Sequence, residues 1–380
     1  MPQEAPIISL SHSLPDQPKR AKQASRPAVH AGAGKARILW LDVAKGLGIL
    51  LVVLGHALGG IVDMPGRTVP SAFREIFVGI YVFHMPVFFM LSGLMVRPRL
   101  ARSRKGFLID LVITVAYPYF LWSIIQYSAI YAAGSLVNRP VERFWPAILN
   151  LPWATISQFW YLYVLFLMHM MALMLLPRIG ARNFFLAAVA AKLVIAVLAQ
   201  PYVPPAAIRL LMVHGMFYAA GVWAGIEGLA HLRQWLGTRR WLVALLLSSA
   251  VAGVMLAVSY IVAARGAEFY QLKSYEISVL AWRLSLVPIA TIATLAFVAC
   301  AFLPSGGIEK MLAYLGRRTM AIFVLHVLFI AGTRIVLSGA MPSADPLLLL
   351  GACSLTGLLA PLAVYAVVRR FTTSRALGLG

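Results

Sequence analysis

The strongest constraint on this chain is the repetition of apolar runs long enough to cross a membrane. A spanning helix needs about 20 mostly apolar residues, because each residue rises ~1.5 Å through a hydrocarbon core about 30 Å thick. Ten such runs occur, near residues 38–61, 74–96, 107–133, 158–177, 183–200, 206–226, 241–263, 276–302, 319–338 and 346–368. Of the 380 residues, 61% are hydrophobic and 12% charged, a balance that cannot cover a soluble surface. We expect an all-α, polytopic membrane helix bundle of about ten transmembrane helices.

Basic residues in the connections predict the orientation of this bundle. Alternate connections place 22 Lys and Arg residues on one side of the membrane and seven on the other. The richer side faces the cytoplasm, so both termini are expected there. The formal net charge of +21 is then explained by topology, without nucleic-acid binding.

Three segments follow from the apolar pattern. Residues 1–37 are rich in Pro, Ser, Ala, Lys and Arg and lack apolar periodicity, which predicts a disordered cytoplasmic tail. Residues 38–370 form the predicted membrane domain, and residues 371–380 form a second cytoplasmic tail. The connections are too short for a separate soluble catalytic domain. Any chemistry is therefore expected within the helix bundle or at its mouths.

The first apolar run, Leu39–Gly60, contains the ionisable residues Asp42, Lys45 and His56. Such residues cost roughly 2.5–3.5 kcal/mol each to insert, so they usually face the bundle interior or a wet cavity. Lys45 and His56 are separated by ~16 Å along the helix axis. Asp42 and Lys45 either neutralise each other or meet an anionic ligand from the cytoplasm. His56 is either a buried, hydrogen-bonded side chain or a general base deep in the membrane.

Two further histidines stand out within predicted spans, His84 in YVFHMPVFF and His326 in FVLHVLF. Imidazole gains and loses protons near neutral pH, so three histidines at membrane depth favour proton handling. We expect no metal site, because the sequence has no i,i+4 His pair or carboxylate partner. The two cysteines, Cys300 and Cys353, form neither a disulfide framework nor a metal-binding spacing.

Arginines provide two more candidate sites. Arg99 and Arg102 lie in the basic segment RPRLARSRK, the predicted first cytoplasmic loop. They are either topological charges or, because guanidinium groups bind phosphate bidentately, a phosphate site. Arg283 and Glu276 share one face of the eighth predicted span. That pair is either a buried structural ion pair or a substrate contact.

Five motifs occur in a fixed order along the chain. They are DVAKGLGILLVVLGH, which contains Lys45 and His56; FHMPVFFMLSG, Phe83–Gly93; the pair Arg99 and Arg102; FWYLYVLF, Phe159–Phe166; and LAYLGRRTMAIFVLH, Leu312–His326. Together they resemble the acyltransferase-3 family of bacterial integral-membrane O-acyltransferases. The FHMP motif and the DxxKG start are most similar to the branch that contains fucose O-acetylases, Nod-factor acetylases and exopolysaccharide acetylases. The resemblance covers residues 39–326, nearly all of the membrane region.

The resemblance implies transfer of an acyl group, acetyl in the first place, from cytoplasmic acyl-CoA to a hydroxyl of a surface or exported carbohydrate. Acyl-CoA is then a co-substrate, and no bound cofactor is expected. The implied location is the bacterial inner membrane, in the lipid bilayer beside membrane proteins of glycan biosynthesis. By match to the motifs, the implied catalytic residues are His56, His84 and His326, the acyl-CoA-binding residues are Asp42, Lys45, Arg99 and Arg102, and the substrate-binding residues are Trp160 and Arg283.

Two other functions remain open at this stage. Ten spans with polar residues at membrane depth also suit a proton-coupled transporter or flippase of a polar lipid or solute. No inverted repeat or pair of broken spans supports that alternative. A non-catalytic membrane scaffold would tolerate replacement of His56 or Lys45. Acetyl and succinyl donors are both compatible with the acyltransferase hypothesis, as are direct transfer and an acyl-histidine intermediate.

Overall fold

The computed structural model describes residues 38–153, 155, 157–197, 205–265 and 280–380. These residues form helices, turns and loops, with no strand among them. The longer helices are α1 (Leu39–Val62), α2 (Ser71–Leu94), α5 (Tyr117–Ala133), α7 (Trp160–Val197), α8 (Ala206–Gly237), α9 (Arg240–Arg265), α10 (Leu280–Cys300), α12 (Thr319–Ala340) and α13 (Pro346–Phe371). The shorter helical elements are α3 (Val96–Arg102), α4 (Arg104–Leu111), η1 (Val112–Ala116), η2 (Gly134–Leu136), α6 (Phe144–Leu149), η3 (Ser157–Phe159), α11 (Gly306–Gly316) and η5 (Ser374–Leu377).

Eight helical segments of the described residues are long and apolar enough to cross a membrane. The predicted all-α membrane bundle is thereby confirmed. The ten predicted runs differ from these eight in two places. The described residues of predicted runs 158–177 and 183–200 fall almost entirely in α7, and both run 183–200 and run 276–302 lie partly outside the described residues. The part Val287–Cys300 of run 276–302 is a shorter apolar helix.

Gly180 interrupts α7 in the gap between the two predicted runs. Its backbone angles, φ 74° and ψ 167°, are not helical. A positive φ is accessible to glycine because it has no Cβ atom. The 38 residues of α7 would extend ~57 Å as one straight helix, far beyond a ~30 Å hydrocarbon core. The break at Gly180 therefore divides α7 at the position where the apolar pattern predicts a connection.

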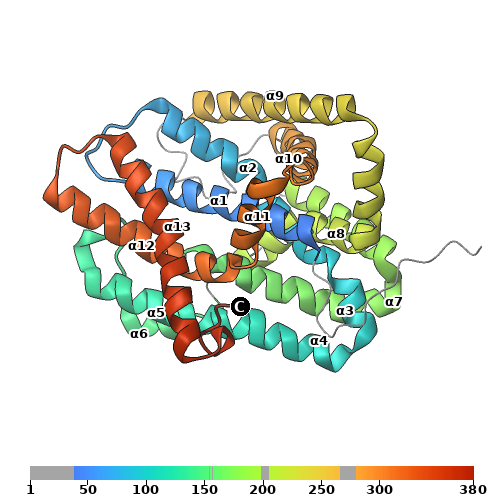
Figure 1. The fold of residues 1–380 in the computed structure, drawn as a ribbon, viewed down its shortest axis with the longest axis horizontal. Helices are drawn as coiled ribbons and strands as arrows, with labels where there is room; N and C mark the ends of the chain where they lie inside the picture. The colour runs from blue at the N-terminus through green and yellow to red at the C-terminus, as the bar shows by residue number, and fades with distance from the viewer. Residues whose placement is uncertain (1–37, 154, 156, 198–204, 266–279) are drawn as a thin grey trace, which may run out of the picture. The chain divides into compact units, whose positions relative to one another are not determined.

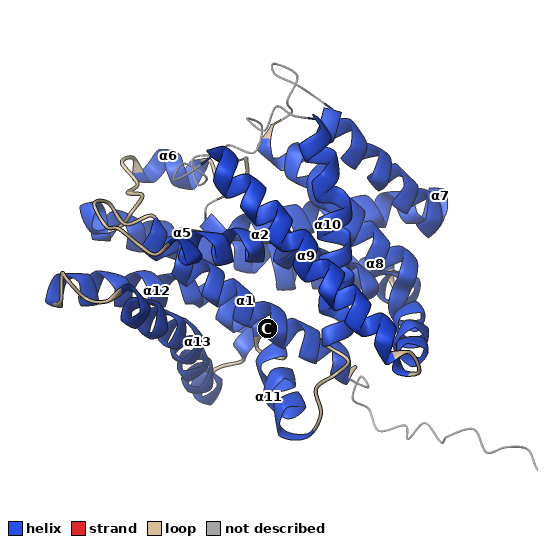
Figure 2. Ribbon diagram, turned by 90° about the horizontal axis from the view of Figure 1, so that it is seen from above, coloured by secondary structure: helices blue, strands red, loops and turns tan. Residues whose placement is uncertain are grey.

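Helix α1 has neighbours on several sides, as Figure 1 shows. It packs against α2, α11, α12 and α13. Figure 2 shows α12 and α13 as a pair beside α1, whereas α9 lies next to α10 and α2. The buried α1 residues include Trp40, Ile49, Val53 and Ala57. Because neighbouring helices cover α1, its ionisable side chains are held within protein, as their insertion cost requires.

Helix α11 approaches α1 through glycine. A Cβ atom on Gly316 would lie 1.7 Å from the carbonyl oxygen of Asp42, and one on Gly46 would lie 2.0 Å from that of Leu312. No side chain fits at either position, so the two backbones are in direct contact. This contact fixes the position of Arg317, the residue that follows α11.

The segment predicted as the first cytoplasmic loop contains short helices. Val96–Arg102 forms α3, and α4 begins at Arg104 after a break at Ser103. The Ser103 hydroxyl caps α4 by accepting a hydrogen bond from the Gly106 amide at 2.9 Å. Arg99 and Arg102 therefore lie at fixed positions on one short helix.

The C-terminal residues fold back onto α5. The Tyr117 hydroxyl donates to the Ala376 carbonyl at 2.7 Å, and the Trp122 indole donates to the Leu377 carbonyl at 2.9 Å. Leu379 is buried within the apolar core. The segment predicted as a second tail is therefore packed against the membrane domain.

Candidate active site

His56 on α1 lies beside His326 on α12. Their ring centroids are 4.9 Å apart, and the ring planes meet at 66°. Nδ1 of His326 lies 3.0 Å from the Ile322 carbonyl oxygen and 2.8 Å from that of Phe323. A carbonyl oxygen only accepts hydrogen bonds, so Nδ1 carries the hydrogen and Nε2 is an acceptor. This buried Nε2 has no hydrogen-bond partner among the described residues. His326 can thus accept a hydrogen bond from a neighbour such as His56.

Tyr81 connects His84 to this pair. The Tyr81 ring centroid is 4.6 Å from His84 and 6.3 Å from His56. His84 is buried, and its Nδ1 donates to the Ile80 carbonyl at 2.8 Å. A row of polar rings therefore runs from His84 through Tyr81 and His56 to His326.

A cavity of about 470 Å³ opens beside His56, and we name it the His56 cavity. Its walls come from α1, α2, α5 and α12 and from the segment that contains Asn138 and Ser157. Its polar lining residues are His56, Asp63, Tyr81, Gln126, Asn138, Arg139, Ser157 and Arg334. The volume lies within the range of small-molecule sites.

Charged groups line the end of the His56 cavity beyond Gly60. Asp63 forms an ion pair with Arg139 at 2.9 Å. Burial raises the pKa of the Asp63 carboxyl above its ordinary value, and the nearby Arg139 opposes that rise. Arg334 donates to the Asn138 side-chain oxygen, and the Asn138 amide donates to the Gly60 carbonyl at 3.0 Å. This wall therefore carries two guanidinium groups and one carboxylate.

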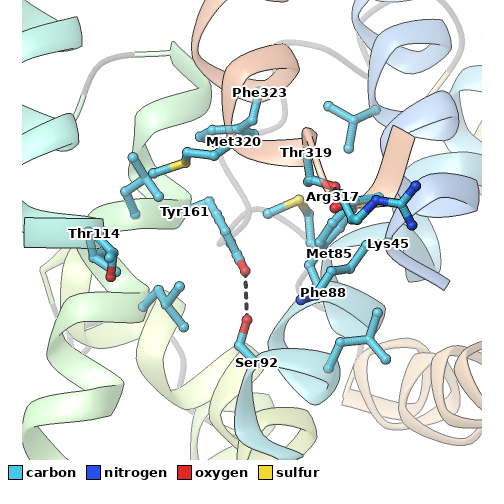
Figure 3. Close-up of a pocket in the computed structure, with 16 residues that line it drawn as sticks. Lys45, Met85, Phe88, Ser92, Thr114, Tyr161, Arg317, Thr319, Met320 and Phe323 are labelled. Carbon is cyan, nitrogen blue, oxygen red and sulfur yellow. Dashed lines mark hydrogen bonds between the residues drawn. The ribbon is translucent and has the colours of Figure 1, made fainter. Parts of the chain in front are cut away.

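A second cavity, the Lys45 cavity, has a volume of about 280 Å³. Figure 3 shows Lys45 reaching toward Ser92 and Tyr161, whose hydroxyls are 3.0 Å apart. Arg317 also lines it, together with apolar side chains such as Phe88. The cavity thus combines cations with a largely apolar wall.

A third, smaller cavity of about 160 Å³, the Arg99 cavity, shares Lys45 and Ser92 with the Lys45 cavity. Arg99 and His169 are among its other lining residues. Lys45 lies within electrostatic reach of Asp42 and Arg99. Lys45 forms no ion pair within 4 Å in the part of the chain that the structure describes. The shared lining places Lys45 between two sources of positive charge.

One helical turn separates the Lys45 cavity from the His56 cavity. On α1, Val52 lines the first cavity and His56 lines the second. On α12, Phe323 lines the first and Val327 the second. Four residues rise ~6 Å along a helix. The two cavities therefore approach each other closely, with Phe323 and His326 on the intervening turn of α12.

The predicted residues fall into distinct groups in space. His56, Lys45 and Arg99 line cavities, and His84 and His326 lie in the row of rings. Asp42 is near Lys45, and its Oδ2 is buried without a hydrogen-bond partner among the described residues.

Trp160 and Arg102 are not brought to the three cavities described above. Trp160 packs against Phe89 and His214, with ring centroids 6.0 and 5.4 Å away, while its neighbour Tyr161 lines the Lys45 cavity. Arg102 is exposed on α3. The Arg283 side chain and Glu276 lie outside the described part of the molecule.

Three of the lining residues that the sequence analysis does not single out carry a signal in the sequence. Arg317 belongs to the LGRRT part of the last motif. Tyr161 belongs to the FWYLYVLF motif, next to the predicted Trp160. Arg334 lies inside the ninth predicted span, and an arginine at such a position is by default a functional candidate. All three therefore had a detectable signal.

Comparison with known proteins identifies the family. The family model described as an acyltransferase domain matches residues 38–366, which include the lining of all three cavities and all five motifs. The chain belongs to this acyltransferase-3 family. The curated Nodulation protein NolL of Mesorhizobium japonicum is 28% identical over 151 residues, which are 39% of this chain and 38% of that protein. The match therefore spans little more than a third of the curated relative. No solved structure matches significantly.

The family and the fold together define the class of protein. The match confirms the resemblance to the acyltransferase-3 family that was drawn from the motifs. The eight apolar helices found among the described residues make the chain a multi-pass membrane protein. Residues of helix α1 line both the Lys45 cavity and the His56 cavity of this family member.

Proposed function

We propose that this acyltransferase transfers an acyl group, acetyl in the first place, from cytoplasmic acyl-CoA to a carbohydrate hydroxyl. In this proposal it acts in the bacterial inner membrane with both termini in the cytoplasm. The observation that carries the proposal is the arrangement of two unlike cavities along α1. The Lys45 cavity is cationic and largely apolar, whereas the His56 cavity is polar and wide. A reaction between two unlike substrates requires such a pair.

The donor suits the Lys45 side. Coenzyme A carries phosphates on a nucleotide and a long, thin pantetheine arm. Lys45, Arg99 and Arg317 supply cations that can bind those phosphates. The arm would pass along the apolar wall toward His56, which lies ~16 Å farther along α1. The thioester would then reach the turn at which the two cavities approach each other.

The acceptor suits the His56 side. Sugar hydroxyls need hydrogen-bond partners when they leave water, and amide, hydroxyl and charged groups line this cavity. One hydroxyl would lie against the His56 ring. His326, with an acceptor nitrogen next to that ring, would position His56 with its basic nitrogen toward the hydroxyl.

The chemical step follows from these placements. His56 accepts the proton of the acceptor hydroxyl as a general base. The oxygen attacks the thioester carbonyl carbon, the carbon–sulfur bond breaks, and the CoA thiolate takes up the proton. The products are the O-acyl carbohydrate and free CoA. His84 and Tyr81 would complete the row of rings through which protons are exchanged.

Acceptor-dependent release of CoA tests the proposed function. Membranes that contain the protein receive acyl-CoA labelled in the acyl group, with and without an extract of surface glycans. We expect CoA release only with glycan, together with label in the glycan. Movement of a glycan or lipid across the membrane without CoA release would instead support the transporter. An isolated protein labelled on His56 would indicate an acyl-enzyme step.

A further inference from the structure

Arg334 is a buried cation at the far end of the His56 cavity, and the chemical step above does not use it. Its residue is 7% exposed, although it sits in a helix long and apolar enough to cross a membrane. Insertion of an arginine at such a depth is costly, and such residues commonly mark a substrate site. The position therefore calls for a partner of opposite charge.

The neighbours of Arg334 leave most of its hydrogen-bonding capacity unused. A guanidinium group has five N–H donors. One nitrogen donates to the Asn138 side chain, and that is the hydrogen bond found for Arg334 among the described residues. The nitrogens of Arg334 are not among the fully enclosed, unpartnered atoms, so they remain accessible from the cavity that the residue lines. The free N–H donors of Arg334 thus face the His56 cavity.

The charge around Arg334 is not balanced. Asp63 is the acidic residue of the cavity lining, and it is bound by Arg139 at 2.9 Å. Asp63 attracts Arg334 electrostatically but lies beyond ion-pair distance. A neutral ligand that displaced water here would leave the buried guanidinium with an uncompensated charge. A carboxylate or phosphate would match it in charge and in geometry.

Helix α1 sets the distance between Arg334 and the acceptor hydroxyl at His56. A Cβ atom on Gly60 would lie 3.8 Å from Nε of Arg334, and Gly60 follows His56 by one helical turn. One turn is ~6 Å along the axis. An acidic group bound at Arg334 is therefore close enough to belong to the acylated sugar or to the residue linked to it.

We propose that the His56 cavity selects an acidic carbohydrate acceptor, whose carboxylate or phosphate binds Arg334 one helical turn from His56. This inference rests on the proposed function, since it assigns the acceptor to that cavity. The acidic group has two possible sources, a uronic acid and a sugar phosphate. Both present paired oxygens to the guanidinium group.

Binding to the purified full-length protein tests this proposal without requiring acyl transfer. The probes are glucuronate, glucose 1-phosphate and two neutral counterparts, glucose and glucuronamide. We expect at least one acid to bind roughly tenfold tighter than its neutral counterpart, as a charge-assisted contact implies. The tighter acid identifies the source of the charge. Arg334→Gln should abolish the preference, and Arg334→Lys should retain part of it.

Arg143→Gln serves as the matched control, because Arg143 is exposed in the segment that contains Asn138 and does not line the His56 cavity. Equal binding of glucuronate and glucuronamide, an acid preference that survives Arg334→Gln, or no binding of any probe would overturn the inference. Equal binding of glucuronate and glucuronamide to wild type overturns the inference even if the Arg334 variants do not fold. Equal acyl transfer to acidic and neutral glycans would reject this inference alone. Absence of acyl transfer to any glycan would reject the proposed function.

Discussion

The two ends of α1 differ in what surrounds them. At the Lys45 end, the cations Lys45, Arg99 and Arg317 meet an apolar wall, and the glycine contact between α1 and α11 holds the arrangement together. At the His56 end, amides, hydroxyls and an ion pair surround a wider space. The difference suggests a division of labour. The Lys45 end suits a polyanion with a thin apolar arm, and the His56 end suits a polar acceptor and the proton transfer.

The largest expected effect comes from His56. His56→Gln removes the base while keeping a polar side chain of similar size, so the transfer rate should fall by about 10²- to 10⁴-fold. The measurement is initial-rate formation of the O-acyl glycan in membranes with equal protein content. His231→Gln is the control, because His231 is exposed on α8. Full activity in His56→Gln would refute the assignment of His56 as the general base.

Lys45 should affect the donor rather than the chemistry. Lys45→Met keeps the aliphatic stem but removes the charge, and a charge-assisted hydrogen bond contributes about 1.5–3 kcal/mol. Affinity for acyl-CoA should therefore fall roughly 10- to 100-fold, as measured by equilibrium binding. Lys192→Met is the matched control, since Lys192 is a second cation within an apolar helix and lines none of the three cavities. Similar losses in both variants would argue against a specific donor contact.

The contact between α11 and α1 can be tested by adding one methyl group. Gly316→Ala would place a Cβ atom 1.7 Å from a backbone oxygen of α1, which cannot move aside as a side chain does. The overpacking should cost about 1–3 kcal/mol, lower the Tm and displace Arg317 from the Lys45 cavity. Gly307→Ala is the control, because nothing lies within 4 Å of its Cβ position. An unchanged Tm and donor affinity in Gly316→Ala would disprove the close contact.

The smallest expected effect is the difference between substitutions of Arg99 and Arg102 on α3. Arg99 lines the Arg99 cavity, whereas Arg102 does not. Exposed ion pairs contribute about 0.2–1 kcal/mol, so Arg99→Gln should raise KM for acyl-CoA by up to about fivefold. Arg102→Gln should change it less, and each variant serves as the control for the other. A larger effect of Arg102→Gln would show that CoA approaches along a different face of α3.

Sequence reasoning succeeded where one helix carries the information. Apolar run length predicted the bundle, and the rise per residue separated Lys45 from His56 along α1. It failed where rotation about the helix axis decides which side chain faces a cavity. Tyr161 and Trp160 are adjacent, yet a helix turns by about 100° per residue, so only one faces the Lys45 cavity.

Contacts between distant segments were beyond sequence reasoning. The contact of Gly316 with Asp42 joins residues far apart in the chain, and no local sequence pattern predicts it. The juxtaposition of His56 with His326 likewise depends on the packing of α1 against α12. Arg334 is a different case, because its position in an apolar run was visible and its insertion cost was a usable signal.

One measurement tests most directly whether the two ends of α1 bind different substrates. It is equilibrium binding of a non-transferable acyl-CoA analogue to wild type, His56→Gln and Lys45→Met in the same membrane preparation. The account predicts that His56→Gln, although inactive, binds the analogue as tightly as wild type, while Lys45→Met binds it roughly 10- to 100-fold more weakly. Donor binding that is weakened as much by His56→Gln as by Lys45→Met would contradict the assignment of the two ends of α1 to different substrates.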